Sequence, residues 1–226
     1  MKQSEDVSLL VVRRLPRYYR FLTELKKSGI VRISSKELAR RMRLTASQIR
    51  QDLNCFGGFG QQGYGYNVDQ LSDEIEKILR LDTRLPAIVI GIGNLGRALS
   101  SYLYEANGVE LIGLFDKNPK SVLDFNPDLE IMGITKLDEF CIANKPLIAI
   151  LCIPSEHAQQ MAARLVSLGI RGFWNFSHVE LHLDSDICIE NVHLGDSLMT
   201  LGYNVNQALD KLASSDHKTA MDHNKH

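Results

Sequence analysis

Three glycines in the middle of the chain have the spacing that other proteins use to hold the phosphates of a dinucleotide. Gly91, Gly93 and Gly96 form the pattern G-x-G-x-x-G directly after the apolar residues 88–90. In a strand–turn–helix unit the first glycine permits a tight turn and the second lets the backbone approach a pyrophosphate. The third lets the helix pack closely on the strand. The start of such a helix also attracts anions.

An acidic residue stands where a dinucleotide site needs one. Residues 109–115 are suited to a second strand, and Asp116 ends that strand, 20 residues after Gly96. A carboxylate at this position accepts hydrogen bonds from the hydroxyls of the adenine ribose, and it would repel a 2′-phosphate. The pattern therefore predicts NAD(H) rather than NADP(H).

The elements that must position these residues alternate between strands and helices. Apolar runs predict three further strands, at 147–153, 172–176 and 187–192. A further helix is predicted at 155–168. Such alternation is typical of a doubly wound parallel sheet. Cys152 and Pro154 lie at the carboxyl end of one strand, where the crevice of the sheet would hold the nicotinamide.

A second group of residues could contact nucleic acid. The helix expected at 46–56 places Ile49, Leu53 and Phe56 on one face, and a short helix at 36–42 precedes it. Two short helices joined by a tight turn are typical of a helix-turn-helix. The opposite face of the second helix carries groups that read base edges and phosphates, namely Ser47, Arg50, Gln51 and Asn54.

The surrounding sequence favours a polyanion-binding module. Residues 8–50 contain 12 basic and 2 acidic side chains, which is typical of nucleic-acid binding, although a solvated basic face would look the same. Residues 57–65 contain five glycines, with aromatic residues at 59, 64 and 66. This stretch is either the hairpin of a wing or a flexible linker.

Composition excludes several classes of protein. The 226 residues are 44% hydrophobic and 23% charged, as in globular proteins rather than disordered ones. No apolar run is long enough for a transmembrane helix, and the first residues do not resemble a signal peptide, so we expect a cytoplasmic protein. The four cysteines form no C-x-x-C pair. Cys152 and Cys188 are expected to be buried, and no metal site is expected.

The rest of the chain favours a binding protein over an enzyme. All seven histidines follow residue 156, and no catalytic pairing is visible among them. The predicted sheet uses the whole of 86–192, which leaves no substrate domain. An amphipathic helix at 196–212 could pack on its own sheet or on a partner subunit. Residues 214–226 are polar and expected to be disordered.

These stretches together resemble the Rex family of redox-sensing transcriptional repressors. The resemblance covers residues 8–212 and is carried by LPRYY at 15–19, SKELA at 35–39, IRQDL at 49–53, FGGFG at 56–60, GYGYNV at 63–68, GIGNLG at 91–96, FD at 115–116 and NF at 175–176. It implies a homodimer that exchanges its C-terminal helices, binds a palindromic operator when free or holding NAD⁺, and leaves the operator when NADH binds. The alternative is a Rossmann enzyme or a CoA-type ligand binder with an incidental winged helix.

The resemblance also implies roles for individual residues, none of them catalytic or metal-ligating. The dinucleotide would contact Gly91, Ile92, Gly93, Asn94, Leu95, Gly96, Asp116, Tyr102, Cys152 and Pro154. DNA would contact Ser47, Gln48, Arg50, Gln51, Phe59, Gly60, Tyr66 and Arg14. The switch and the subunit interface would involve Arg20, His193 and Leu194.

The sequence departs from the family pattern in four places, one of them a pair of residues. Gln51 and the pair Gln61–Gln62 replace basic residues, and Asn94 replaces an arginine. Losing phosphate contacts predicts weaker or altered operator binding. His193 stands where the family has an aspartate. Either this histidine makes the NADH response pH-dependent, or it only hydrogen-bonds at a strand end.

The predicted fold is of the α/β class. An N-terminal winged helix-turn-helix domain is followed by a Rossmann-type doubly wound parallel sheet and a C-terminal, domain-swapped helix. The expected boundaries are 1–82 for DNA binding, 83–194 for NAD(H) binding, 195–213 for the dimerisation helix and 214–226 for the tail.

Overall fold

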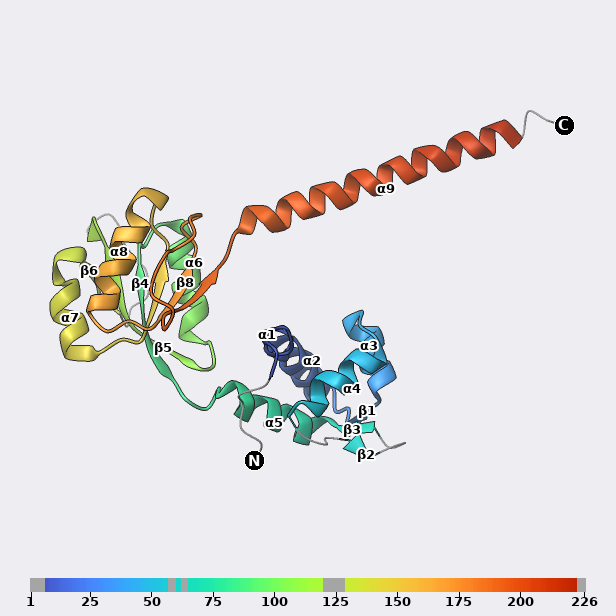
Figure 1. Ribbon diagram of the computed structural model, residues 1–226, viewed down its shortest axis with the longest axis horizontal. Coiled ribbons are helices and arrows are strands. Elements are labelled where there is room, and N and C mark those ends of the chain that lie inside the picture. The colour runs from blue at the N-terminus through green and yellow to red at the C-terminus, as the bar shows by residue number, and fades with distance from the viewer. Residues whose placement is uncertain (1–6, 57–59, 62–64, 120–128, 223–226) are drawn as a thin grey trace. The chain divides into compact units, whose positions relative to one another are not determined.

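The chain folds into two compact units, an N-terminal unit that ends at Arg84 and a sheet unit that begins at Leu85. Figure 1 shows the computed structural model, which describes residues 7–56, 60–61, 65–119 and 129–222. Leu85 and Pro86 are the first residues of the first strand in the sheet unit.

Helices and short strands alternate in the N-terminal unit. The described elements are α1 (Leu9–Val12), α2 (Leu15–Lys27), β1 (Arg32–Ile33), α3 (Ser35–Met42), α4 (Ala46–Asn54), β2 (Gly60–Gln61), β3 (Gly65–Asn67) and α5 (Val68–Leu79). The strands form an antiparallel sheet in the order β1-β3-β2 (Figure 1). The hairpin of β2 and β3 follows α3 and α4, so this unit is a winged helix-turn-helix.

Local signals set the ends of α2. Pro16 occupies its first turn, where its missing N–H costs no hydrogen bond. Gly29 ends it with a φ of 71°, and the N–H of Ile30 donates to the carbonyl of Leu25 at 3.0 Å. Because Ile30 closes the helix in this way, β1 begins only at Arg32.

The turn between α3 and α4 is defined by caps. The Ser34 hydroxyl accepts a hydrogen bond from the Glu37 N–H at 3.0 Å at the start of α3. Arg43 ends that helix in the left-handed region, with a φ of 54°. The Thr45 hydroxyl begins α4 by accepting from the Gln48 N–H at 3.1 Å.

The core of the N-terminal unit joins four of its helices. Leu22 of α2, Leu38 of α3, Leu53 of α4 and Ile75 of α5 are all buried in one apolar cluster. Burying one such side chain stabilises the folded state by about 2 kcal/mol. This cluster therefore holds α4 with its polar face outward.

The hairpin of β2 and β3 depends on one glycine. Gly65 has a φ of 71°, and a Cβ there would lie 2.6 Å from the carbonyl oxygen of Ile33. Only glycine fits this close approach of β3 to β1. Phe59 and Gln62, both expected in the wing, lie outside the described residues.

In the part of the sheet unit that the structure describes, six strands run parallel. Its elements up to the last helix are β4 (Leu85–Ile90), α6 (Asn94–Tyr104), β5 (Val109–Asp116), β6 (Ile131–Gly133), a 3₁₀ turn (Ile134–Lys136), α7 (Leu137–Asn144), β7 (Ile148–Leu151), α8 (Ser155–Ser167), β8 (Gly172–Asn175) and β9 (Cys188–Asn191). The strand order is β6-β5-β4-β7-β8-β9. Two halves therefore extend in opposite directions from the β4–β7 pair, which confirms the predicted doubly wound sheet.

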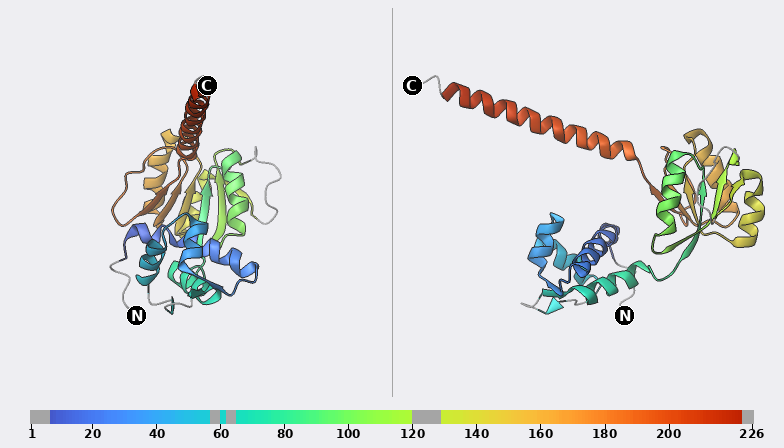
Figure 2. Two further views of the ribbon diagram at one scale, coloured as in Figure 1. Left: turned by 90° about the vertical axis from the view of Figure 1, so that its right-hand side faces the viewer. Right: turned by 180° about the vertical axis from the view of Figure 1, so that it is seen from behind.

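Helices cover both faces of this sheet. α6 lies on one face, and α7 and α8 lie on the other (Figures 1 and 2). β6 and α7 were not predicted, because a strand of three residues and a helix of eight offer too few positions for a periodic signal. Pro154, not Ser155, is the residue before α8, and no side chain caps that helix.

Two expectations about the end of the chain were wrong. The last helix, α9 (Leu194–Asp222), continues well beyond residue 214. The segment after Leu212 contains no glycine or proline, the two residues that most disfavour a helix interior. Cys188 is exposed rather than buried, because β9 is the last strand of the sheet. Among the described residues, no helix is long and apolar enough to cross a membrane.

Candidate dinucleotide site and nucleic-acid interface

The fingerprint glycines form the turn between β4 and α6. Gly91 has a φ of 93°, and a Cβ there would lie 2.5 Å from the carbonyl oxygen of Cys152. A Cβ at Gly96 would collide with the carbonyl oxygen of Gly91. A Cβ at Gly93 would meet no atom within 4 Å. Two of the glycines are therefore required by the protein itself, whereas the space at Gly93 is open to a ligand.

The start of α6 is suited to an anion. Gly93 precedes the helix, and no described side chain caps it. The first turn, Asn94 to Gly96, therefore has no side-chain acceptor for its N–H groups, at the positive end of the helix dipole. A pyrophosphate group has the charge and the acceptor oxygens that such a turn lacks.

Asp116 lies beside this turn at the end of β5. Its carboxylate accepts hydrogen bonds from the N–H of Ile92 and the N–H of Asn118, both at 2.7 Å. The Gly91 N–H donates to the carbonyl of Phe115 at 2.8 Å, which ties the turn to β5. A carboxylate has about four acceptor positions, so Asp116 can still accept from ribose hydroxyls.

Cys152 lies opposite the fingerprint turn. Its N–H donates to the carbonyl of Ile90 at 2.9 Å, just after the paired ends of β4 and β7. This is the point where the strand order reverses, and ligands of open α/β sheets bind there. Burial raises the pKa of the Cys152 thiol to about 12, so the thiol stays protonated at neutral pH. Pro154 follows on the same side, before α8.

Tyr102 lies away from this turn. Its side chain is 63% exposed, and it is eight residues along α6 from Asn94. Eight residues of helix span about 12 Å. The structure therefore brings Gly91, Asp116 and Cys152 together, whereas Tyr102 stands apart from them.

A buried amide at the end of β8 was not recognised as a site residue. The Asn175 side chain donates to the Val179 carbonyl at 2.6 Å and to the Asn191 side chain at 2.8 Å. It also accepts from the Ser177 N–H and hydroxyl, at 3.1 and 2.5 Å. An asparagine within an apolar strand was the available sequence signal. The Asn175 side chain ties β8 to β9 at the edge of the candidate site.

His193 and Leu194 connect β9 to α9. The His193 ring stacks on that of His178, with 6.2 Å between ring centroids. His178 has a left-handed backbone, with a φ of 59°, and lies between Ser177 and Val179, both of which are hydrogen-bonded to Asn175. Leu194 is the exposed first residue of α9. The structure describes no ligand near His193, so its role in a switch stays a prediction.

The exposed face of α4 is the one that the periodicity predicted. Ser47, Arg50, Gln51 and Asn54 are exposed, whereas Ile49 and Leu53 are buried. Arg50 donates to the hydroxyl of Ser35 at 3.1 Å, which connects α4 to the start of α3.

Four other predicted DNA contacts have partners inside the protein. Tyr66 of β3 is 7% exposed and belongs to the core. Arg14 donates to the Asp52 carboxylate at 2.6 and 2.8 Å, and Gln48 donates to it at 2.8 Å. Gly60 pairs with Tyr66 in the β2–β3 hairpin. Arg20 is exposed on α2.

Asp52 is a second residue that the sequence reasoning missed. It is fully buried, and Tyr18 also donates to it at 2.8 Å. Burial opposes ionisation of Asp52, but hydrogen bonds from Arg14, Gln48 and Tyr18 outweigh it and lower the pKa. The pKa of Tyr18 is raised by its burial and by the adjacent carboxylate. The available signal was the position of Asp52 between Ile49 and Leu53, on the apolar face of α4.

Family models match two stretches of this chain. Residues 6–54 match the family model "Putative DNA-binding protein N-terminus", and residues 82–179 match "CoA binding domain". A redox-sensing transcriptional repressor Rex from Caldanaerobacter subterraneus subsp. tengcongensis is 53% identical over 92% of this chain and 93% of its own.

Two solved structures of RSP, a Rex-family repressor, are also similar to this chain. The complex with β-NAD⁺ and operator DNA is 50% identical, with a TM-score of 0.82, over 92% of this chain and 97% of that one. The complex with β-NADH is 47% identical, with a TM-score of 0.82, over 92% and 100%. By its sequence and its fold, this chain belongs to the Rex family of redox-sensing transcriptional repressors.

Proposed function

We propose that this chain binds palindromic operator DNA as a homodimer and releases it when NADH occupies the turn between β4 and α6. One observation carries this proposal: the chain combines an open, uncapped fingerprint turn beside Asp116 with a helix-turn-helix whose second helix exposes Ser47 and Arg50. RSP, 50% identical, was solved with both NAD⁺ and operator DNA. No catalytic role is proposed for any residue.

The ligand at the fingerprint turn is inferred to be NAD(H). The open space at Gly93 and the bare first turn of α6 suit a pyrophosphate, which CoA also contains. Asp116 discriminates further, because a carboxylate favours ribose hydroxyls and repels the ribose phosphate groups of NADP(H) and CoA. CoA is therefore a useful negative control rather than a second candidate.

DNA contacts are assigned to the exposed face of α4 and to the hairpin of β2 and β3. Ser47, Arg50 and Gln51 are the proposed contacts on α4, together with Gly60 in the hairpin. Phe59, outside the described residues, stays a proposed contact from the family resemblance. Arg14 and Tyr66 are withdrawn from direct contact, because one is bonded to Asp52 and the other is buried. We infer that the protein works in the cytoplasm, where an operator would be reached.

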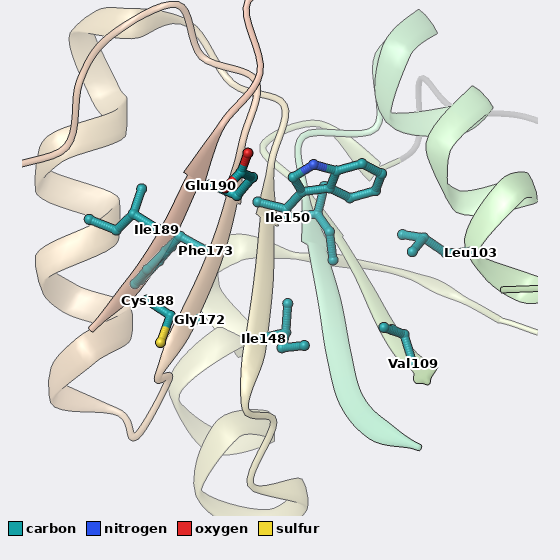
Figure 3. Close-up of a pocket in the computed structure, with 10 residues that line it drawn as sticks. Leu103, Val109, Ile148, Ile150, Gly172, Phe173, Cys188, Ile189 and Glu190 are labelled. Carbon is teal, nitrogen blue, oxygen red and sulfur yellow. The ribbon is translucent and has the colours of Figure 1, made fainter. Parts of the chain in front are cut away.

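Dimerisation is proposed to cover two apolar surfaces of the sheet unit. The first is a groove of about 400 Å³ on the sheet face beside α6, where the strands β7 to β9 lack a covering helix (Figure 3). It is lined by Leu103, Val109, Ile148, Ile150, Gly172, Phe173, Trp174, Cys188, Ile189 and Glu190.

The second surface is α9 itself. Seven large apolar side chains of this helix beyond Leu194 are exposed, namely Leu198, Met199, Leu201, Tyr203, Val205, Leu209 and Leu212. An amphipathic helix gains most of its stability from packing its apolar side. Exchange of α9 between two copies of this chain would bury that side, as the resemblance implies.

The test is a fluorescence-anisotropy titration of the full chain onto a palindromic duplex that the chain selects from a random-sequence library. We expect specific binding by the protein alone and with NAD⁺, and release by NADH. Neither NADPH nor CoA should release the duplex at the same concentration. Failure to select any duplex, or release by NAD⁺ and NADH alike, would contradict the proposed function.

The His193 hypothesis is tested in the same assay. If His193 makes the response pH-dependent, the NADH concentration for half-release should differ between pH 6 and pH 8 in the wild type. His193→Asp should reduce that difference. Equal half-release concentrations in both proteins at both pH values would leave His193 only a structural role.

A further inference from the structure

A buried carboxylate on α4 has all of its acceptor positions filled. Arg14 donates from Nε to Oδ2 and from Nη2 to Oδ1 of Asp52, at 2.6 and 2.8 Å. Tyr18 donates to Oδ2 at 2.8 Å, and Gln48 donates to Oδ1 at 2.8 Å. Each oxygen therefore accepts two hydrogen bonds, close to the limit for a carboxylate. Among the described residues, no buried side-chain polar atom of this cluster lacks a partner.

The three residues that donate to Asp52 have different positions relative to the surface of α4. Tyr18 is fully buried in the core, and Arg14 is 26% exposed at the start of α2. Gln48 is on α4 itself, one turn before Asp52, and is partly exposed between Ser47 and Ile49. Only the Gln48 bond therefore reaches from the buried carboxylate to the part of α4 proposed to face DNA.

An ionised carboxylate can only accept hydrogen bonds, so it dictates which way the Gln48 amide is turned. The NH₂ group of Gln48 must lie toward Asp52, and its carbonyl oxygen must lie away from it. The free carbonyl oxygen and the second N–H then remain for another partner. A neutral partner such as asparagine could bond either end of the amide and would leave its orientation undetermined.

We propose that Asp52 is a positioning residue, which fixes the orientation of the Gln48 amide and thereby sets a base preference of α4. The remaining carbonyl and N–H of Gln48 match the N6 donor and N7 acceptor of adenine in the major groove. Residues near the start of the second helix are those that reach base edges in a helix-turn-helix. This inference rests on the proposed function, because it requires α4 to lie in the major groove.

The experiment measures base preference rather than affinity alone. The full-length wild type selects its duplex from the random library, and each base pair of one half-site is then replaced in turn. Anisotropy titrations give the dissociation constant for every duplex. A loss of folded structure weakens all duplexes by the same factor, whereas a positioning role changes the ratio at one A·T pair.

We expect Gln48→Ala and Asp52→Asn to reduce the wild-type preference at the same A·T pair, from about tenfold to nearly one. The double variant should lose no further preference, because both changes remove one contact. Tyr18→Phe is the matched control, since it removes another hydrogen bond from the same carboxylate. It should lower the melting temperature and leave the preference unchanged.

Asp52→Glu covers the case in which Asp52→Asn does not fold. It keeps the charge for Arg14 but moves the carboxylate by one methylene, so it should also reduce the preference. Uniform weakening by the Asp52 variants, or an unchanged preference in Gln48→Ala, would overturn the inference while leaving the proposed function intact. A wild type that selects no duplex would overturn both.

Discussion

Helix α4 and the fingerprint turn before α6 differ in how their polar groups are hydrogen-bonded. Behind α4, the Asp52 carboxylate is saturated by three side chains and held in a packed core. At the start of α6, no described side chain caps the helix, and Gly93 leaves open space. A helix that must present one fixed face is held in place by hydrogen bonds from the core. A turn that must receive a ligand keeps N–H groups that no described side chain caps.

The comparison has a physical basis. A buried polar group without a partner is costly, so the polar cluster behind α4 stabilises only one arrangement of α2 against α4. Helix-end N–H groups in contact with water are satisfied by the solvent at little cost. An anion can displace that water, so the open turn needs no rearrangement to bind one.

The largest expected effect is a loss of stability when Gly96, but not Gly93, of the fingerprint turn is replaced. Gly96→Ala places a Cβ against the carbonyl of Gly91, so it should destabilise the sheet unit by about 3 kcal/mol and abolish NADH binding. Gly93→Ala should change stability by less than about 0.5 kcal/mol. It should still weaken NADH binding, because the methyl group enters the space of the ligand. Thermal unfolding and NADH titration by calorimetry measure both; equal destabilisation by the two variants would break the comparison.

The next effect is a loss of stability at the polar cluster around Asp52, behind α4. Asp52→Asn leaves Arg14 without its charged partner and should cost about 3 kcal/mol of unfolding free energy at pH 7. The folded-state pKa of Asp52 is lowered, so its contribution is present above the unfolded pKa of about 4 and is lost as the pH falls through the folded value. The stability gap between wild type and variant should therefore close toward pH 3. Urea unfolding at pH 7 and pH 3 checks this, and a constant gap would show that Asp52 is not ionised in the fold.

A smaller effect is expected at the rim of the open turn. Asp116→Asn keeps an acceptor for the Ile92 N–H but removes the charge. It should weaken NADH binding about tenfold, or about 1.4 kcal/mol, and narrow the discrimination against NADPH. Tryptophan or nicotinamide fluorescence titrations with both nucleotides measure this. Unchanged discrimination would mean that Asp116 only supports the turn.

The smallest effect is expected when positive charge is added at Gln51 or Gln62. Gln51→Lys and Gln62→Arg should each steepen the salt dependence of operator binding by about one unit of slope, because each adds one phosphate contact. Gln70→Lys, on the exposed start of α5, adds the same charge elsewhere and is the matched control. Anisotropy titrations between 50 and 200 mM salt supply the slopes. A slope shared by wild type and both variants would show that Gln51 and Gln62 do not stand at phosphates.

Patterns with a local cause were predictable from the sequence. The spacing of Gly91 and Gly96, the position of Asp116 and the polar face of α4 all follow from hydrogen bonds and periodicities within one strand–turn–helix or one helix. The doubly wound sheet followed from their repetition. β6 was missed, because three residues at a sheet edge carry no period.

Long-range partners were not predictable. The family resemblance implied that Arg14 and Gln48 contact DNA, but it gave no sign that both side chains donate to Asp52. Arg14 and Asp52 are 38 residues apart, so nothing local in the sequence indicates the pair. Tyr66 was likewise expected at the surface of the wing and is buried in the core.

The sequence by itself determined the order of the elements, the fingerprint turn and the family to which this chain belongs. The tertiary structure alone decided which polar side chains form hydrogen bonds within the protein and which remain available to a ligand or to DNA. The physical reason is that glycine spacing and helix caps act between near neighbours. The partner of a charged side chain depends instead on which helices pack together, and only the folded core of α2, α4 and α5 specifies that.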